Sequence, residues 1–358
     1  MKKLLAIGLT LIMVCCPLAV MADEEASVDA ENVLSHDLEL GDAPLSEYTP
    51  QKDEYNLYLT YKLIHPWWDS VGIGIQDAVD RYADMGITVN VDYNAPVQPD
   101  ASDQVARIEQ AAGNKFDVIG VDVCDIEIVT PTINRLIADG KKIMTFSSSD
   151  ATKEDGCDRI AYVGNTHNYQ DGVDLAEKLA EMIDYKGQVA ALCGTIGAPC
   201  HEDRKRGFDD VMAKYPDIEV VDEQYDNDSV ENALAITEGW MQTYPDLVGI
   251  FANNMGNPIG ASQAVIDAGR TDQITIVGMD HDLRALEYLR DGVITALGIQ
   301  DCYKMGFDTV QVAIMIADGV EVGEDTFPEQ LAEETTICYQ KDAQAIIDFL
   351  YPGQSSAS

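Results

Sequence analysis

Six short loops hold the residues of this chain that are best suited to chemistry, because each carries polar or aromatic side chains and directly follows an apolar run. They cover residues 62–68, 124–125, 147–150, 195–203, 253–254 and 280–281. The first loop contains Trp67 and Trp68, two of the 3 tryptophans in the chain, and the others supply carboxylates, amides, hydroxyls and imidazoles. Such groups are typical of sites that hold a small ligand by stacking and hydrogen bonding.

Motifs for catalysis, cofactor binding or metal binding find no support in the sequence. The segment "GIG" at 72–74 lacks the third glycine of a dinucleotide-binding turn, and Asp77 stands in its place. No phosphate-binding G-x-x-x-x-G-K-[ST] loop, no G-x-S-x-G elbow and no H-x-x-x-H or H-E-x-x-H pair occurs. We therefore expect a protein that is not an enzyme and that has no cofactor and no metal.

The elements that must position the loops alternate along the chain from about Tyr55 onwards. Short apolar or β-branched runs such as "YNLYLTY" and "FDVIGVDV" alternate with stretches of helical periodicity, among them 71–85, 130–139 and 229–244. This alternation indicates βαβ units, an α/β fold and parallel sheets that are covered on both faces. Ligands bind such sheets where loops leave the carboxyl ends of the strands, so we expect the six loops to converge at one rim.

Histidines are concentrated in or next to these loops, where His65, His167, His201 and His281 are found. Loops are polar in any case, so the placement alone leaves open whether two or more of these imidazoles line a cleft. Their spacing does not indicate a preorganised metal site.

The first 22 residues have the order of a secretory signal peptide. Lys2 and Lys3 precede an apolar run, and small residues precede the expected cleavage position after Ala22. The apolar run is short for a membrane anchor, and "IMVCC" fits a lipid-attachment site poorly, so we expect an exported protein that is periplasmic or extracellular. Residues 23–54 are rich in Asp, Glu, Ala and Ser, which predicts a disordered acidic linker.

Size and charge restrict the remaining classes of protein. Roughly 300 residues follow the linker, which exceeds one core of usual size and suggests two lobes. The chain carries 23 basic and 63 acidic residues, a formal net charge of −40. A surface so negative repels phosphate backbones, so nucleic acid is excluded as a partner. Cation capture remains an alternative to simple solubility outside the cell.

The cysteines outside the signal peptide are Cys124, Cys157, Cys193, Cys200, Cys302 and Cys338. An even number in an exported protein permits disulfides. Cys193 and Cys200 bracket a short loop and are the best candidates for a disulfide, although pairing cannot be deduced from a sequence. No C-x-x-C occurs, which disfavours a zinc or redox site.

Several longer segments match one known family in order and in spacing. They are "HPWWDSVGIGIQDAVD", "VGNTHNYQDGVDLAEKLA", "GQVAALCGTIGAPCHEDRKRGFDDVMAKYPDIEVV", "LVGIFANNMGNPIGA" and "ITIVGMDHDLRALEYLRDGVITALGIQDCYKMGF". Through them the chain, from Tyr55 to about Leu350, resembles the type I periplasmic binding proteins of sugar ABC transporters, the branch with ribose-, galactose- and xylose-binding proteins. The resemblance implies two Rossmann-like lobes with parallel sheets, joined by a three-strand hinge. It also implies a monomer that serves the membrane permease of an ABC importer.

The same resemblance implies a division of the chain into lobes. Crossings between the lobes would fall near Tyr162, near Gln300 and near Cys338. The N-terminal lobe would then comprise residues 55–161 and 301–337, and the C-terminal lobe residues 162–300. Residues 338–358 would form the last crossing and a C-terminal tail.

Carried over position by position, the resemblance assigns Trp67 and Trp68 to stacking on a sugar ring. It assigns Asn254, Asp280 and Gln300 to polar contacts with the ligand. A sugar offers C–H faces to aromatic rings and hydroxyls to carboxylates and amides, which agrees with these residue types. Together with the loops at the strand ends, this gives the candidate ligand-binding residues His65, Trp67, Trp68, Asp125, Ser147, Ser148, Asp150, His201, Glu202, Arg204, Asn254, Asp280 and Gln300.

Several of these positions depart from the family pattern. His65 stands where asparagine is usual, and Ser147 and Ser148 stand where relatives often carry Asp-Arg. Glu202 occupies the place of a common ligand arginine, so Arg204 serves the helix or reaches the cleft. With carboxylates nearby and these arginines missing, we expect a cleft that disfavours anions and takes a neutral sugar or polyol. The alternatives are a sensor that binds a signal molecule, nucleoside or amine, and a secreted carbohydrate-acting enzyme.

Overall fold

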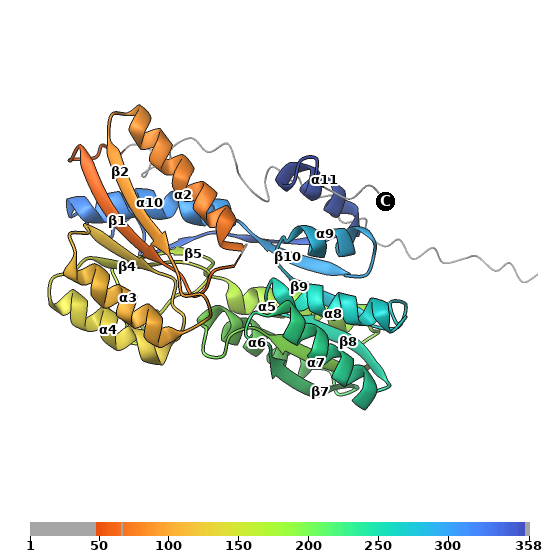
Figure 1. Ribbon diagram of the computed structural model, residues 1–358. Coiled ribbons are helices and arrows are strands. Elements are labelled where there is room, and N and C mark those ends of the chain that lie inside the picture. Colours follow the sequence, from red (N-terminus) through yellow and green to blue (C-terminus); the bar gives the residue numbers. More distant parts are fainter. Residues whose placement is uncertain (1–47, 66, 355–358) are drawn as a thin grey trace, which may run out of the picture.

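The computed structural model describes residues 48–65 and 67–354 (Figure 1). The expected signal peptide and the expected linker up to residue 47 lie outside the described residues. The end of that linker is folded rather than disordered: the Tyr48 and Tyr55 hydroxyls each donate to Asp318 Oδ2 at 2.7 Å. No helix in the described part of the chain is long and apolar enough to cross a membrane.

The first lobe is built on a six-stranded sheet in the order β11-β5-β4-β3-β1-β2, with every recorded strand pair parallel. Its strands are β1 (Glu54–Thr60), β2 (Thr88–Asn94), β3 (Val118–Val121), β4 (Ile143–Ser147), β5 (Tyr162–Gly164) and β11 (Gln330–Ala332). Its helices are α2 (Trp67–Asp84), α3 (Ala101–Gly113), α4 (Ile126–Ala138) and α10 (Cys302–Asp318).

Alternation along β1 explains how both faces of this sheet are covered. Leu57 and Leu59 belong to a core cluster with residues of α2 and α10, whereas Tyr58 belongs to a cluster with residues of α3 and α4. Successive side chains of a strand point to opposite faces, so the apolar run of β1 is buried on both sides.

The second lobe repeats this plan with a six-stranded sheet in the order β12-β10-β9-β8-β6-β7. Its strands are β6 (Gly187–Cys193), β7 (Ile218–Tyr225), β8 (Leu247–Ala252), β9 (Thr275–Met279), β10 (Ala296–Gln300) and β12 (Thr335–Tyr339). Its helices are α5 (Asn168–Met182), α6 (Pro199–Met212), α7 (Val230–Thr243), α8 (Gly256–Asp267), α9 (Leu283–Arg290) and α11 (Gln340–Leu350). Only the pair β10–β12 is antiparallel among the recorded pairs of this sheet.

Helices α2 and α10 cross at two glycines. A Cβ atom at Gly74 would lie 1.9 Å from the Tyr303 carbonyl oxygen, and one at Gly306 would lie 2.0 Å from the Val71 carbonyl oxygen. The crossing thus brings two helix backbones into contact, which is a close approach that only glycine permits. Gly74, the second glycine of "GIG", serves this helix packing, which agrees with the sequence-based rejection of a dinucleotide turn.

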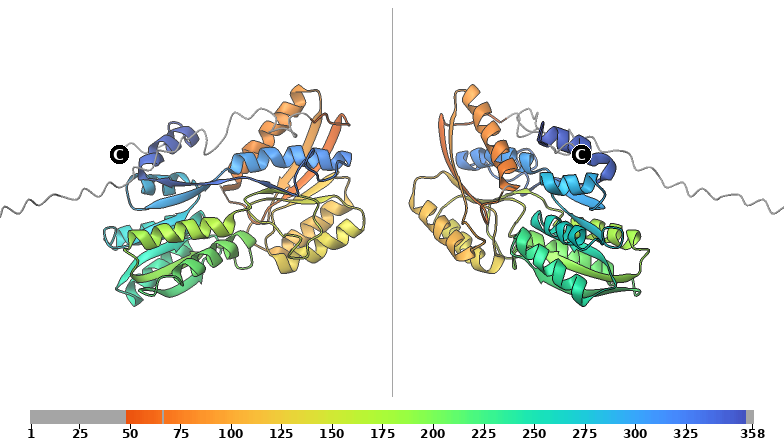
Figure 2. Two further views of the ribbon diagram at one scale, coloured as in Figure 1. Left: turned by 180° about the vertical axis from the view of Figure 1, so that it is seen from behind. Right: turned by 45° about the vertical axis from the view of Figure 1, so that its right-hand side comes forward.

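Three segments join the lobes, which lie side by side in all three views (Figures 1 and 2). They run from β5 to α5, from β10 to α10, and from β11 to β12. β5 lies in the first sheet although residues 162–164 were expected in the C-terminal lobe, and residues 335–337 lie in the second sheet although they were expected in the N-terminal lobe. The predicted α/β fold with two parallel-dominated lobes is confirmed.

Candidate ligand-binding site

A cavity lies where the carboxyl ends of the strands of the two lobes face each other. It has an empty volume of about 370 Å³. This volume includes space that is open to solvent. The first lobe contributes Lys62, Leu63, His65, Trp67, Trp68 and Ser148 to its lining, and the second lobe contributes Cys200, His201, Arg204, Asp228, Asn254, Met255, Gly256, Asp280 and Gln300.

The aromatic wall of the cavity is formed at the start of α2. The indole of Trp68 stacks on Tyr61 with ring centroids 4.6 Å apart, and Trp67 meets Trp68 edge-on at the same centroid distance. Both tryptophans are buried, with 6% and 2% of their surface exposed. Trp68 is thus held by the core of the first lobe, and it in turn fixes the ring of Trp67 at the cavity.

Asp280 connects this wall to the second lobe. Its Oδ1 atom accepts hydrogen bonds from Trp67 Nε1 at 2.8 Å and from Gln300 Nε2 at 2.7 Å. Asp280 follows β9 with a φ of 74°, a left-handed conformation that is unusual outside glycine. Its backbone N–H donates to the Gly298 carbonyl at 2.7 Å, which holds the residue in this conformation.

Arg204 reaches the cavity from α6 with only 2% of its surface exposed. Its guanidinium donates to the Asn253 carbonyl at 3.0 Å, to Asn168 Oδ1 at 2.7 Å and to Gln300 Oε1 at 2.9 Å. The Nε atom has no hydrogen-bond partner among the described residues. Arg204 therefore orients Gln300, and of the two roles expected for it, the helix or the cleft, the structure gives it the cleft.

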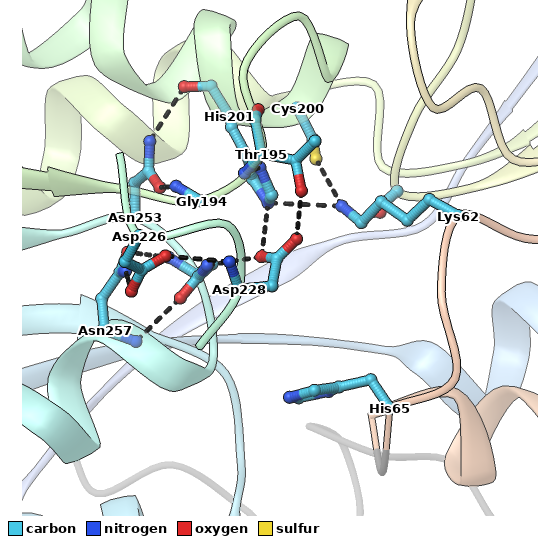
Figure 3. A network of polar contacts seen from close by, with 12 residues as sticks. Lys62, His65, Gly194, Thr195, Cys200, His201, Asp226, Asp228, Asn253 and Asn257 are labelled. Carbon is cyan, nitrogen blue, oxygen red and sulfur yellow. Dashed lines mark hydrogen bonds and ion pairs between the residues drawn. The ribbon is translucent and has the colours of Figure 1, made fainter. Parts of the chain in front are cut away.

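A second polar cluster lies at the other end of the cavity and joins Lys62 to residues of the second lobe (Figure 3). Lys62 Nζ lies 3.5 Å from Cys200 Sγ and 3.3 Å from His201 Nε2. Asp228 accepts from Thr195 Oγ1 and from Asn254 Nδ2, each at 2.5 Å, and its Oδ1 lies 3.7 Å from His201 Nε2.

The charged side chains of this cluster stabilise one another electrostatically. Burial disfavours the carboxylate of Asp228, but His201 and Lys62 together hold its pKa below the usual value. Burial likewise disfavours the ammonium of Lys62, but Cys200, Asp228 and Asp122 raise its pKa above the usual value. Lys62 and Asp228 are thus both charged at neutral pH although both lie in the interior.

His65 enters the same space from the first lobe (Figure 3). Its Nδ1 atom accepts the Trp67 backbone N–H at 3.4 Å. Burial lowers the pKa of His65, against the opposing effects of Asp228 and Asp280. The ring is therefore neutral at pH 7 and offers one hydrogen-bonding nitrogen to the cavity.

Nine of the thirteen candidate residues line the cavity. They are His65, Trp67, Trp68, Ser148, His201, Arg204, Asn254, Asp280 and Gln300. The sequence rule behind them is that the carboxyl ends of parallel strands meet at one edge. The structure places these nine together, and contact with a ligand stays a prediction for each.

The other four candidates lie outside this lining and have local partners instead. Asp125 is the N-cap of α4 and accepts the Ile128 N–H, because that helix begins at Ile126 rather than at residue 130 as expected. Glu202 accepts the Gly197 N–H at 2.9 Å and the Tyr225 hydroxyl at 3.0 Å.

Asp150 and Ser147 are likewise engaged within the first lobe. The Asp150 carboxylate holds the guanidinium of Arg159, at 2.5 Å and 2.7 Å. Ser147 has a φ of 74°, and its hydroxyl faces Met305 Sδ at 4.0 Å. Both side chains therefore support the loop after β4 and do not face the cavity.

The expected disulfide between Cys193 and Cys200 is wrong, since all six cysteines of the described chain are free and buried. The two thiols face different surroundings. Cys193 lies near Lys205 and Glu223, between α6 and β7, whereas Cys200 faces Lys62 in the cavity. Flanking a short loop was therefore a misleading signal, because β6 and α6 direct these side chains apart.

Three lining residues with strong chemistry were missed as ligand-site candidates. Lys62 lies two residues after the end of β1, so its position in the first loop was the available signal. Asp228 directly precedes Ser229, the N-cap of α7, and is of a residue type common at helix starts. Cys200 was assigned to the disulfide. Only the fold shows that Lys62, Cys200 and Asp228 line the same cavity.

Two similar α/β lobes, joined by three segments around a buried cavity with aromatic and polar walls, define a bilobal ligand-binding protein. A family profile described as "periplasmic binding protein domain" matches residues 58–321. The chain belongs to this periplasmic binding protein family, and the predicted resemblance is confirmed.

Individual relatives are similar along most of the chain. A xylitol-binding protein of Mycolicibacterium smegmatis is 24% identical over 253 residues, which are 70% of this chain and 68% of the relative. A D-apiose import binding protein of Actinobacillus succinogenes is 27% identical over 242 residues, 67% of this chain and 74% of the relative. The crystal structure of a glucose-galactose binding protein from Geobacillus stearothermophilus has a TM-score of 0.73 and 25% identity, covering 81% of this chain and 99% of that one.

Proposed function

We propose that this protein captures a small neutral carbohydrate or polyol and delivers it to an ABC importer. The relatives named above bind xylitol, D-apiose, or glucose and galactose, all of which are small, uncharged and rich in hydroxyls. They are binding proteins and not enzymes. We extend this to the present chain and assign it no catalytic activity.

The observation that carries the proposal is the position of Trp67 beside Asp280 and Gln300. An aromatic face next to a carboxylate and an amide matches a sugar, which has C–H faces and a rim of hydroxyls. Hydrogen bonds to a charged group are roughly twice as strong as neutral ones. The wall and the polar pair together therefore provide both stacking and directional contacts.

The charge of the lining supports a neutral ligand, for a different reason from the one expected. The sequence argument assumed a cleft without arginine clamps, whereas Arg204 and Lys62 both line the cavity. Two basic groups face the two carboxylates Asp228 and Asp280, so the lining presents charges of both signs. A ligand with a net charge of either sign would meet a like charge in this buried lining.

Closure of the lobes around the ligand follows from contacts across the cavity. Trp67 donates to Asp280, Lys62 approaches His201, and Ser70 Oγ lies 3.1 Å from His281 Nε2. We take the lobes as 48–164 with 302–332, and 168–300 with 335–351. A ligand that contacts both lobes favours the closed arrangement over the open one, and a permease can distinguish the two.

The remaining parts of the proposal concern the cell. We assign residues 1–22 to export and place the mature protein outside the cytoplasmic membrane, as a monomer that docks on the permease. The family match and the sugar-binding relatives support this assignment.

A thermal-shift screen over aldoses, ketoses, polyols, nucleosides and amines tests the proposed function. A carbohydrate at 100 times its dissociation constant should stabilise the protein by about 2.7 kcal/mol. The bound compound should be recovered unchanged after incubation. A clear shift with a polyamine and none with any neutral carbohydrate would contradict the proposal, as would recovery of a chemically altered sugar.

A further inference from the structure

The thiol of Cys200 has surroundings that differ from those of an ordinary buried cysteine. It lies in the first turn of α6, which begins at Pro199 and has 14 residues. Two donors point at its sulfur: Lys62 Nζ at 3.5 Å and Ser149 Oγ at 3.2 Å. In both contacts the sulfur is the acceptor, and the helix N-terminus adds a partial positive charge beside it. These are the surroundings of a thiolate.

Lys62 has nearby carboxylates but none in direct contact. Its side chain is buried, and it forms no ion pair with a carboxylate within the described chain. Its two recorded contacts are the Cys200 sulfur and the His201 ring. Asp228 and Asp122 act on this ammonium from a longer distance, so a thiolate at Cys200 would be the negative group in direct contact with it.

Every charged group around Cys200 can be named. Lys62 faces it from the loop after β1, Asp122 from the loop after β3, His201, Asp203 and Arg204 from α6, and Asp228 from the loop before α7. Burial opposes the charge on sulfur, but His201 and Lys62 hold the pKa of Cys200 well below its usual range.

The other five thiols contrast with this one. Burial raises the pKa of Cys124 and of Cys338 to about 12, and it also raises the pKa of Cys157, Cys193 and Cys302. The described part of the chain thus combines one cysteine in electropositive surroundings with five whose thiols are held protonated by burial. Cys193, a few residues before α6, provides a matched internal control.

Cys200 also lines the cavity rather than a closed core. Arg204, on the same lining, adds a second positive charge near the sulfur. We propose that Cys200 is a nucleophilic modification site inside the cleft and that it takes small, uncharged carbon electrophiles. Haloacetamides, α,β-unsaturated carbonyls and α-oxoaldehydes belong to this class.

With iodoacetamide the reaction is a simple displacement. A lone pair of the Cys200 sulfur forms the S–C bond while the C–I bond breaks, and iodide leaves with the electron pair. No proton is transferred, because the sulfur is already deprotonated. The product is a neutral thioether, so Lys62 loses its counter-charge and the space between the lobes is filled.

Access to the sulfur depends on movement of the lobes. Cys200 has 0% of its surface exposed, and Lys62 and Ser149 cover it from the first lobe. Separation of the lobes removes both covering residues at once. This step rests on the hinge motion of the proposed function, whereas the thiolate itself does not.

Two measurements on the full chain test the proposal and separate these steps. The first is the ultraviolet thiolate absorbance of the wild type minus that of Cys200→Ser at about pH 6, where an ordinary thiol of pKa about 8.5 is almost entirely protonated. The second is alkylation by iodoacetamide, followed by peptide mass spectrometry without any sugar present. We expect a thiolate signal at this pH and selective alkylation of Cys200.

The pH dependence provides the sharpest criterion. For an ordinary thiol the rate falls by more than about a hundredfold between pH 8.5 and pH 6. For Cys200 we expect less than a tenfold decrease, and Lys62→Met should restore the ordinary decrease. Cys193→Ser should leave the alkylation of Cys200 unchanged.

The contrary outcomes are distinct. Absence of the thiolate signal at pH 6, or alkylation of Cys200 no faster than of Cys193, overturns the assignment of the thiolate and leaves the sugar proposal intact. A thiolate signal without alkylation overturns the modification site and also contradicts opening of the lobes.

Discussion

Trp67 and Asp280 are 213 positions apart in the chain, yet Trp67 Nε1 donates to Asp280 Oδ1 at 2.8 Å inside the cavity. One belongs to the first turn of α2 and the other to the loop after β9, so the bond links the two lobes. Asp280 also accepts from Gln300, which is held by Arg204. This hydrogen bond therefore joins the aromatic wall of the first lobe to Asp280 and Gln300 of the second lobe, and it is made when the lobes are closed.

Replacing Trp67 with phenylalanine should weaken ligand binding. The ring remains for stacking, but the N–H is lost and the carboxylate of Asp280 loses a donor. Hydrogen bonds to charged groups contribute about 1.5–3 kcal/mol, so the dissociation constant should rise by about 10- to 100-fold. Isothermal titration with the carbohydrate that gives the largest thermal shift measures this change.

Trp240 provides the matched control, because its Nε1 donates to Asp222 Oδ2 at 2.7 Å far from the cavity. Trp240→Phe removes the same chemical group and should leave the dissociation constant unchanged. Equal affinity of Trp67→Phe and the wild type would show that the interlobe bond has no part in binding.

The sheet rule explains why the sequence located most of the cavity. Trp67, Asn254 and Asp280 each follow a buried strand, and parallel strands place their carboxyl ends at one edge. The rule gives the edge but not the direction of each side chain. Asp125 and Glu202 lie at the same edge, yet each carboxylate accepts a nearby backbone N–H. Local hydrogen bonds of this kind leave no signal in the pattern of apolar residues.

Arg204→Lys should reduce both affinity and stability. The guanidinium holds three acceptors in a planar arrangement, and one ammonium cannot reach the Asn253 carbonyl, Asn168 and Gln300 together. Leaving buried acceptors without donors costs about 1–3 kcal/mol each. Urea unfolding should show a loss of at least this size, and the dissociation constant should rise at least tenfold.

Arg206→Lys tests whether any arginine of α6 has this effect. Its side chain is 61% exposed and pairs with Asp203 within the same helix. Exposed pairs of this kind contribute little, so this variant should match the wild type within about 0.5 kcal/mol. Similar losses in both variants would assign the effect to the helix and not to the cavity.

Gly306→Ala should destabilise the first lobe. The new Cβ would lie 2.0 Å from the Val71 carbonyl oxygen, so α2 and α10 would have to move apart. Overpacking of this kind typically costs about 1–3 kcal/mol. Gly239→Ala is the control, since nothing lies within 4 Å of its Cβ position on α7, and it should stabilise by about 0.5–1 kcal/mol. A neutral Gly306→Ala would contradict the close helix crossing.

The crossings between the lobes show where sequence information ends. Alternation of apolar runs predicts strands and helices, but it does not say which of two similar sheets a short strand joins. β5 and β12 have 3 and 5 residues, and each lies next to a crossing. The sheet that β5 joins depends on its pairing with β11, more than 100 positions further along the chain. No local sequence pattern records such a pairing.

Asp122→Asn should remove a pH dependence of stability. Asp122 is 0% exposed; its Oδ1 accepts the Ser149 N–H at 3.0 Å, and its Oδ2 has no hydrogen-bond partner among the described residues. Burial raises its pKa to about 7, against the opposing effect of Lys62. The native state therefore holds a proton that the unfolded chain releases near its ordinary value of 3.8.

The sign of the effect follows from this difference. The stabilisation from the protonated carboxyl is fully present below about pH 4 and is lost as the pH rises through about 7. Within this window the wild type should lose stability relative to Asp122→Asn by up to about 1.4 kcal/mol per pH unit, because asparagine cannot ionise. Urea unfolding of both proteins between pH 5 and 8 measures the difference, and the exposed Asp246→Asn should run parallel to the wild type. Parallel curves for Asp122→Asn would show that this carboxyl is ionised in the native state throughout, with Lys62 as its effective partner.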